Sequence, residues 1–353
     1  MHVLLGEVYD LALSKAEELR RRAEEEWVAG GLVREAWRPY TPSPSGLIKL
    51  CGVDGGRNYE EYRGYVVYVI DAEAVIYRGE EVEEPVKLFE VDVLTPHRYV
   101  EERIKTYGEV LELKAALKAL EERRVELALL DGSLISSLIK PLYAERGRGL
   151  AGIEGFAAKL EGLDVGLPYV ASKELWPQLK EAYGGEAGKA LSYLGGVEKL
   201  VVLRRLLESG WGRLAFISKT SRGIDYFNSF KPDLALFQQA TRGAGYSRPM
   251  VVSVGSKVRR RLPVHAKFFK SLELTLFYAR LENQGPVLRF EVPERLEPSE
   301  VEELLDKLSP YAVAGYPYPL NKAHLDVEVG DHEVEKVARI IGLHRAEEVA
   351  PLG

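Results

Sequence analysis

Two aspartates lie in matching settings that suit metal-assisted chemistry. Asp54, in GVDGG (52–56), and Asp131, in LLDGSL (129–134), each follow an apolar run and precede a glycine. Taken singly, each has a structural interpretation, because Asp-Gly is a common hairpin turn and an aspartate before a helix is a common N-cap. If both close adjacent strands, their carboxylates converge and repel, an arrangement that divalent cations normally stabilise. The following glycine would let a metal ion or a phosphate approach the backbone closely.

A third acid is expected from the helical stretch KTYGEVLELKAALKA (105–119), where Glu109 and Glu112 are the candidates. Residues three and four positions apart are neighbours on a helix. The helical neighbours of Glu112 include three small residues: Gly108, Ala115 and Ala116. The helix face that carries Glu112 can therefore lie close to a sheet. Glu109 lies beside Lys105, which suits a solvated rim. We expect Glu112 to be the acid, with an exposed helix glutamate as the alternative.

The surrounding pattern predicts the elements that would bring these acids together. Alternating apolar residues predict strands at 47–54, 64–71 and 73–79, arranged as an antiparallel meander. A helix over 98–124 and a buried strand ending at Asp131 follow, and then a sharp turn and another helix. This order is the start of a ribonuclease-H-like fold, whose first and fourth strands are neighbours and carry their carboxylates to one place.

The rest of the chain completes one α/β domain over residues 1–353. Helical spacing predicts a helix over 6–28 that ends at Gly30-Gly31, followed by a Pro/Ser loop at 38–46. Residues 141–210 are helical with glycine breaks, and further strands lie within 213–223 and 248–292. The tail from about 297 is helical and is broken by GYPYPLNKAH (315–324). We therefore expect a mixed sheet flanked by helices, with an N-terminal helical arm (1–40) and a helical insertion (141–210).

Composition excludes several classes of protein. The chain is 46% hydrophobic and 29% charged, which is typical of a globular protein, and no apolar run approaches a membrane span. We expect a soluble, cytoplasmic protein. The single cysteine, Cys51, excludes an internal disulfide and a cysteine-based zinc site. Four Asn, four Gln and two Met indicate a hot environment. A net charge of −6 disfavours nucleic-acid binding by bulk charge but allows a local basic channel.

Four segments in order resemble the motifs of the archaeal NurA nucleases. They are GVDGG (52–56), LLDGSL (129–134), ISKTSR (217–222) and GYPYPLNKAH (315–324), and the resemblance runs from about residue 45 to 345. It implies a ribonuclease-H-like, Mn²⁺-dependent DNA nuclease with single-strand endonuclease and 5′–3′ exonuclease activity. It also implies a homodimer that acts on single-stranded DNA and duplex ends together with HerA, a hexameric ATP-driven translocase.

The resemblance also implies roles for single residues. Asp54, Glu112 and Asp131 would bind two Mn²⁺ ions, and His324 would complete the site, its nitrogen favouring Mn²⁺ over Mg²⁺. Asp326, two residues further along, is the alternative metal ligand to His324.

Two further candidates come from the same motifs: Lys219 and Tyr316. Lys219 could contact the scissile phosphate, or its loop could only cap a helix. Tyr316 could support His324 or position a phosphate, or simply pack in the core.

One basic stretch, KVRRRLPVHAKFFK (257–270), stands out in this acidic chain. Cations that neutralise phosphates, together with aromatic rings that stack on bases, are what single-strand binding requires. The candidates are Arg259, Arg260, Arg261, Lys267 and Phe268. The alternative is a solvated strand pair whose phenylalanines face the core, and strand alternation would let at most one of Phe268 and Phe269 face a groove.

Two other functions fit the same residues. A non-catalytic DNA-end-binding adaptor would use the acids as structural turns, and chelation of metal would then have no cleavage to abolish. Another ribonuclease-H-like nuclease, acting on RNA or on junctions, would share the acids, and a panel of substrates would separate it.

Overall fold

The computed structural model describes residues 6–24, 30–44, 46–140, 150–162, 164 and 166–343. Its strands are β1 Trp37–Pro39, β2 Lys49–Glu61, β3 Val66–Arg78, β4 Glu81–Leu94, β5 Leu127–Asp131, β6 Leu214–Ser218, β7 Gly245–Ser247, β8 Met250–Ser253, β9 Glu273–Arg280, β10 Leu288–Val292, β11 Ala312–Val313 and β12 Tyr316–Pro317. Its α-helices are α1 Gly6–Ser14, α2 Ala16–Glu24, α3 Gly30–Glu35, α4 Val100–Glu121, α5 Leu134–Ile139, α6 Ile153–Glu161, α7 Trp176–Tyr183, α8 Ala187–Ser209, α9 Asp233–Ala240, α10 Val254–Lys257, α11 Ala266–Ser271, α12 Pro298–Leu308, α13 Tyr318–Asp326 and α14 Asp331–Ile340. The described ranges also contain short 3-10 turns: η2 Ala171–Leu175, η3 Gly184–Glu186 and η4 Ser309–Tyr311.

A mixed ten-stranded sheet forms the centre of the fold, in the order β1-β7-β9-β10-β6-β5-β2-β3-β4, with β8 pairing with β9. Strand β2 lies beside β5 and runs parallel to it, so the first and fourth strands of the β2–β5 segment are neighbours, as predicted. Helix α4 connects β4 to β5 and packs against β2 and β3. The expected mixed sheet flanked by helices is therefore present.

The meander that begins with β2 is longer than predicted. The segments 64–71 and 73–79 form one continuous strand, β3, and a third strand, β4, follows it. The predicted division into two strands is wrong, because the apolar alternation continues across it. The chain reverses at Gly79 instead, which adopts a φ of 62° that glycine tolerates best. Strand β2 also runs on to Glu61, so Asp54 lies within the strand and not at its end.

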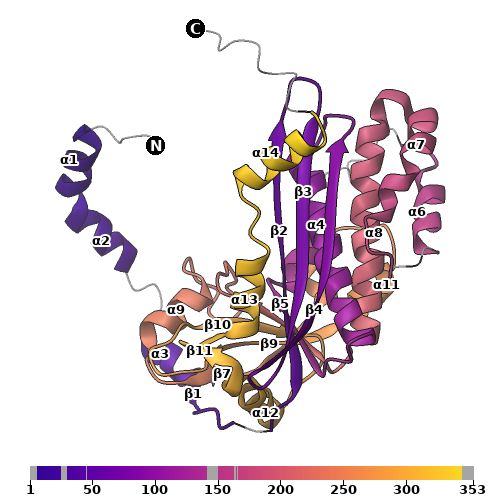
Figure 1. The fold of residues 1–353 in the computed structure, drawn as a ribbon. Coiled ribbons are helices and arrows are strands. Elements are labelled where there is room, and N and C mark those ends of the chain that lie inside the picture. The colour runs from indigo at the N-terminus through magenta and orange to yellow at the C-terminus, as the bar shows by residue number, and fades with distance from the viewer. Residues whose placement is uncertain are drawn as a thin grey trace.

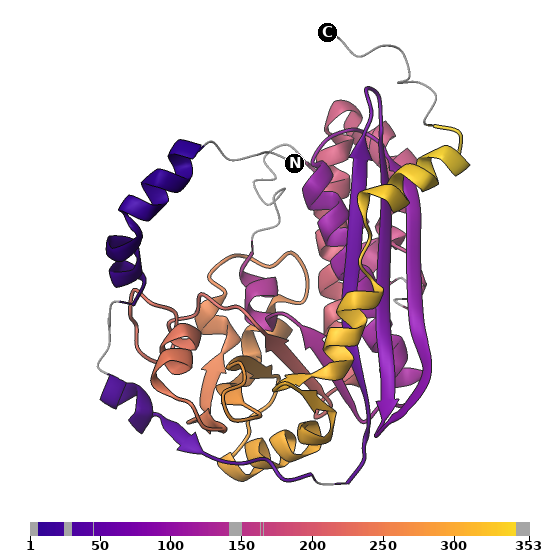
Figure 2. The ribbon, with the colours of Figure 1, turned by 60° about the vertical axis from the view of Figure 1, so that its left-hand side comes forward.

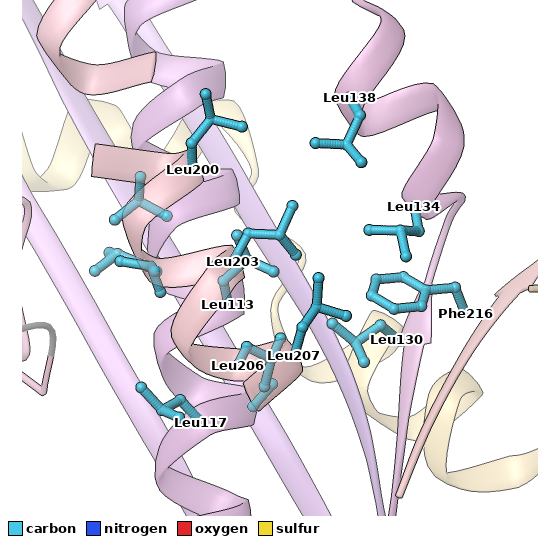
Figure 3. Packing of buried hydrophobic residues seen from close by; sticks show 14 of the residues in the cluster. Leu113, Leu117, Leu130, Leu134, Leu138, Leu200, Leu203, Leu206, Leu207 and Phe216 are labelled. Carbon is cyan, nitrogen blue, oxygen red and sulfur yellow. The ribbon is translucent and has the colours of Figure 1, made fainter. Parts of the chain in front are cut away.

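Helices cover both faces of the meander (Figures 1 and 2). Helices α4 and α8 pack together on one face, and α13 crosses β2 on the other face. The predicted helical insertion contains α6, α7 and α8, although residues 141–149, 163 and 165 lie outside the described part. Figure 3 shows leucines of α4 and α8 facing Leu134 and Leu138 of α5 in the core on the α4 side of the sheet.

Two predictions about the N-terminal and C-terminal parts of the chain need correction. The helix expected over 6–28 is divided into α1 and α2, and Gly30 begins α3 where the sequence pattern predicts a stop. The expected break at 315–324 is mostly helix, because α13 begins at Tyr318. Pro319 lies in its first turn, where the missing N–H of proline has no cost. No helix within the described ranges is long and apolar enough to cross a membrane.

Candidate active site

Asp54 and Asp131 lie on the same face of the sheet, on neighbouring strands. The parallel register pairs Val53 of β2 with Leu130 of β5, so the two aspartates occupy the next positions along their strands. Side chains alternate between faces along a strand. Leu50 and Leu129 pack in the core beneath α13, and the aspartates share their parity and therefore their face. The sequence-based expectation that the sheet brings these two residues side by side is met.

Asp54 is held by two contacts. Its Oδ1 accepts a hydrogen bond from the Gly55 N–H (2.8 Å), and its Oδ2 lies 2.8 Å from Nδ1 of His324. His324 comes from α13, and its side chain is 60% exposed, whereas that of Asp54 is 16% exposed. Because Asp54 pairs with Glu73 in the middle of the β2–β3 ladder, the hairpin-turn interpretation is wrong.

Asp131 closes β5 and faces Lys219, which follows β6. Nζ of Lys219 lies 3.4 Å from Oδ2 of Asp131. Burial raises the pKa of Asp131, the positive charge of Lys219 opposes this, and the negative charge of Asp54 adds to the rise. The helix that follows is capped by Ser133, whose side chain accepts from the backbone N–H of Ser136. Asp131 is therefore not the N-cap of α5.

Tyr316, on β12, packs against Lys219. Nζ of Lys219 stands 4.7 Å from the centre of its ring. Its hydroxyl is buried, and no residue in the described ranges forms a hydrogen bond with it. Burial raises the pKa of Tyr316, and the charges of Asp131 and Asp54 raise it further. The hydroxyl is thus a protonated donor that lies near both aspartates.

Glu112 reaches the site from the opposite face of the sheet, which α4 covers. A Cβ placed on Gly55 would lie 2.5 Å from Cγ and 2.6 Å from Oε1 of Glu112, so the glutamate fills the space that this glycine leaves. Burial raises the pKa of Glu112 to about 8, and the negative charges of Glu109 and Asp54 add to the rise. The positive charge of Arg57, two residues after Gly55 on β2, lowers the pKa of Glu112 and partly offsets this rise.

The two glycines after Asp54 accommodate protein atoms, which corrects the expected role of opening the backbone to a metal ion or a phosphate. Gly55 makes room for Glu112. A Cβ on Gly56 would lie 1.4 Å from the carbonyl oxygen of Val327, so this glycine lets the segment after α13 lie directly on the strand. The close packing of α13 on β2 is what brings His324 to Asp54.

The two alternative metal ligands, Glu109 and Asp326, each form an ion pair with a lysine. Glu109 is not on a solvated rim as expected, because its Oε2 lies 2.7 Å from Nζ of the buried Lys199. Burial tends to raise its pKa, but Lys199 and two further lysines lower it below the ordinary value. Asp326 forms an ion pair with Lys322, one turn earlier on α13.

The donor set fits a divalent cation. Asp54 contacts His324, and its charge acts on both Asp131 and Glu112, so these four side chains from four elements are neighbours. Their oxygen and nitrogen donors suit Mn²⁺. Burial and nearby negative charge raise the pKa values of Glu112 and Asp131, and a bound cation would counter both effects. Within the described ranges no three His, Cys, Asp or Glu side chains form a ready-made metal-binding cluster.

The basic stretch 257–270 does not form strands, so the alternative of a solvated strand pair is wrong. It comprises the end of α10, a loop and α11. Arg260 Nε donates to the carbonyl oxygen of Leu138, at the end of α5 (2.7 Å), while Arg259, Arg261 and Lys267 are exposed. Phe269 is buried, and the guanidinium of Arg204 lies 5.5 Å from the ring centre of Phe268. Phe268 is half-buried and its ring already contacts Arg204, whereas Phe269 faces the core.

Sequence reasoning missed a group of lysines next to this site. Lys105, Lys140 and Lys199 all act on the carboxylate of Glu109. The available signal was the spacing of Lys105, Glu109 and Glu112, at intervals of four and three residues along one helix face. The approach of Lys140 and Lys199 depends on how α5 and α8 pack, and that has no local sequence pattern.

Comparisons with known proteins give matches to one family. A family model described as the NurA domain matches residues 48–329. The chain is 25% identical over 347 residues to the DNA double-strand break repair nuclease NurA of Sulfurisphaera tokodaii, with 97% of each chain covered. It is 29% identical over 319 residues to the protein of the same name from Sulfolobus acidocaldarius, covering 89% of this chain and 87% of that one.

Solved structures give the same fold. The crystal structure of the NurA nuclease from Sulfolobus solfataricus superposes with a TM-score of 0.78 at 24% identity, covering 99% of this chain and 100% of that chain. A structure of NurA bound to dAMP and manganese superposes with a TM-score of 0.69 at 17% identity, covering 96% and 98%.

Proposed function

This chain belongs to the NurA family, and we propose that it is a divalent-metal-dependent nuclease that hydrolyses DNA phosphodiester bonds in double-strand-break repair. The observation that carries the proposal is the approach of Asp54, Asp131 and His324 on one sheet face, with Glu112 entering past Gly55. The adjacency of β2 and β5 supports a ribonuclease-H-like arrangement of these acids.

Asp54, Glu112, Asp131 and His324 would hold the cations. When bound, such ions supply a nucleophile from water at neutral pH and offset the charge that develops on the phosphate. The manganese in two NurA structures supports Mn²⁺ as the ion, and His324 supports a preference for Mn²⁺ over Mg²⁺.

The contact between Asp54 and His324 orients the imidazole. With a proton on Nδ1 shared with the Asp54 carboxylate, the Nε2 of His324 would keep its lone pair for a metal ion. The 60% exposure of the His324 side chain is compatible with that role. Asp54 thus has two roles, because it carries charge at the site and fixes the tautomer of its partner.

Lys219 and Tyr316 would act on the substrate. Lys219 carries a positive charge beside Asp131, where it can bind a non-bridging oxygen of the scissile phosphate. The Tyr316 hydroxyl stays protonated because its pKa is raised, so it can donate a hydrogen bond to the same phosphate. Both groups offset negative charge at the position where the reaction increases it.

The finer features of the family are part of the same proposal. We expect a homodimer that acts on single-stranded DNA and duplex ends, with single-strand endonuclease and 5′–3′ exonuclease activity. We also expect a HerA-type hexameric ATPase as its partner. Arg259, Arg260, Arg261, Lys267 and Phe268 would lie along the DNA path, which the exposure of Arg259, Arg261 and Lys267 supports.

A cleavage assay tests the proposal. Purified protein should degrade single-stranded DNA with Mn²⁺, and EDTA should abolish the activity. Asp131→Asn should be inactive, whereas Asp10→Asn, at an exposed position on α1, should match the wild type. DNA binding without any cleavage would favour the adaptor function. A stronger activity on RNA than on DNA would favour a different nuclease.

A further inference from the structure

A cluster of three lysines lies beside the proposed active site, where α4, α5 and α8 meet. Nζ of Lys199, on α8, lies 2.7 Å from Oε2 of Glu109 and also contacts the carbonyl oxygen of Ser137 on α5 (3.4 Å). Lys105 precedes Glu109 by one turn of α4. Lys140 follows α5 directly, and its amine interacts with Lys105, Lys199 and Glu109.

The charges in this lysine cluster do not balance. Lys199 is buried and paired with Glu109, so that ion pair is neutral. Lys105 and Lys140 then add two positive charges, and neither has a carboxylate within ion-pair distance in the described part of the chain. Burial and the neighbouring lysines lower the pKa of Lys140, which is the cost of bringing these cations together. An anion between them would remove that cost.

The geometry connects the lysine cluster to the acids. Lys105, Glu109 and Glu112 lie at intervals of four and three residues, so they form one stripe along α4. Seven residues of helix place Lys105 about 10 Å along the axis from Glu112. Helix α5 makes the same connection on the other side, since it begins just after Asp131 and ends at Lys140. A chain of phosphates passing the acids between α4 and α5 would reach the lysines next.

We propose that Lys105 and Lys140, supported by the buried Lys199–Glu109 pair, form a phosphate-binding subsite for the substrate strand next to the scissile bond. The subsite reads only the backbone charge, so it is indifferent to base sequence. Lys199 is a positioning residue, because its charge is taken up by Glu109 and it ties α8 to α5. This inference rests on the proposed nuclease function.

The test measures the binding of single-stranded oligothymidylate in EDTA, so that no cleavage occurs, at several salt concentrations. Lys105→Ala/Lys140→Ala should bind several-fold more weakly, and the slope of log K against log salt should become shallower by about 1.4, because each lost phosphate contact removes about 0.7. Lys105→Arg/Lys140→Arg should keep most of the affinity and slope. The control is Lys118→Ala on the same helix, whose lysine is paired with Glu122.

The outcomes separate the two proposals. An unchanged salt slope in the alanine pair, with wild-type protein that cleaves DNA in Mn²⁺, would overturn the subsite alone. An equal loss in the arginine pair would also overturn it, since it would show a packing role and not a charge role. Wild-type protein that neither binds nor cleaves DNA would overturn the nuclease proposal. This outcome is seen with the wild type alone, so it is distinct from a failure of the subsite, which only the variants reveal.

Discussion

The side chain of Glu112 occupies the space in which any residue other than glycine at position 55 would place its Cβ. Strand alternation sends Asp54 towards α13, whereas Glu112 belongs to the helix on the other face. Strand β5 ends at Asp131, so among the described residues β2 has no neighbouring strand on that side beyond Asp54. A side chain from α4 can therefore pass the strand at Gly55 and approach the aspartates.

We predict that Gly55→Ala inactivates the enzyme without altering a proposed ligand. The new methyl group would displace the Glu112 carboxylate, and a shift of about 1 Å at a reacting site can reduce the rate about 10²-fold. The comparison is a single-turnover cleavage rate, with Gly64→Ala as the control because a Cβ there meets nothing within 4 Å. Full activity in Gly55→Ala would show that the position of Glu112 is unimportant.

The raised pKa of Glu112 predicts a pH dependence of stability in metal-free protein. The folded-state pKa of about 8 exceeds the ordinary value of 4.5, so the folded state binds a proton more tightly than the unfolded state between these values. The free energy of unfolding therefore falls as pH rises through this window. Glu112→Gln mimics the neutral form, so its melting temperature should match the wild type below pH 4.5 and exceed it above pH 8.

The expected gain at high pH is on the order of 1–2 kcal/mol, or a few degrees in Tm, after allowance for partial exposure. Thermal melts in EDTA across the pH range measure it. Glu101→Gln, at an exposed position on the same helix, should show no such divergence. If Glu112→Gln and wild type differ by the same amount at both ends of the range, the carboxyl is not titrating in this window.

The parts of the site that the sequence predicts are those encoded by local pattern. The apolar runs before Asp54 and Asp131 define buried strands, and the parallel pairing of those strands places both acids on one face. The small neighbours of Glu112 indicate a helix face that can lie close to a sheet. Each of these predictions depends on a few adjacent residues and on one rule of geometry.

The parts that the sequence does not predict depend on contacts between distant segments. The meander is longer than expected because Asp71 and Glu73 stand within a strand, where the fold buries or half-buries them. The sequence also cannot show that the backbone after α13 lies against Gly56. Likewise, Glu109 looks solvent-facing from its neighbours on α4, and only the packing of α8 brings Lys199 to it.

Asp54→Asn should abolish cleavage while the fold is retained. The amide cannot carry the charge at the proposed metal site, so we expect a loss of about 10²-fold or more. Stability should stay equal or rise in metal-free protein, since Asp54 adds to the raised pKa of both Asp131 and Glu112. Cleavage rates and melting temperatures measure the two effects. Retained cleavage in Asp54→Asn would refute the catalytic assignment.

His324→Ala should reduce activity more in Mn²⁺ than in Mg²⁺, because an imidazole ligand favours Mn²⁺. We expect Mn²⁺ to bind at least about 10–100-fold more weakly, because loss of a residue that only supports a ligand already has that effect and His324 is a proposed ligand. Titration of activity with each ion measures this, and exposed His332 on α14 provides the control substitution. Equal losses in both ions would point to a structural or acid–base role, and Asp326 would become the ligand to test.

The basic stretch 257–270 should contribute to DNA binding through charge. Arg260→Ala/Lys267→Ala should weaken single-strand binding and make the salt slope shallower by about 0.7 for each lost phosphate contact. Lys180→Ala, at an exposed position on α7, should leave the slope unchanged. Cleavage of a short substrate at saturating concentration should persist, because the acids remain in place.

A HerA-type translocase should partly mask this defect, since driven threading raises the local concentration of strand at the site. The double variant should therefore be more impaired alone than with its partner, as cleavage rates in the two conditions will show. Arg260 also donates to the carbonyl oxygen of Leu138, so a melting curve must confirm that α5 keeps its place. An unchanged salt slope in a stable variant would remove this stretch from the DNA path and leave the lysine cluster on α4 and α5 as the proposed contact with the strand.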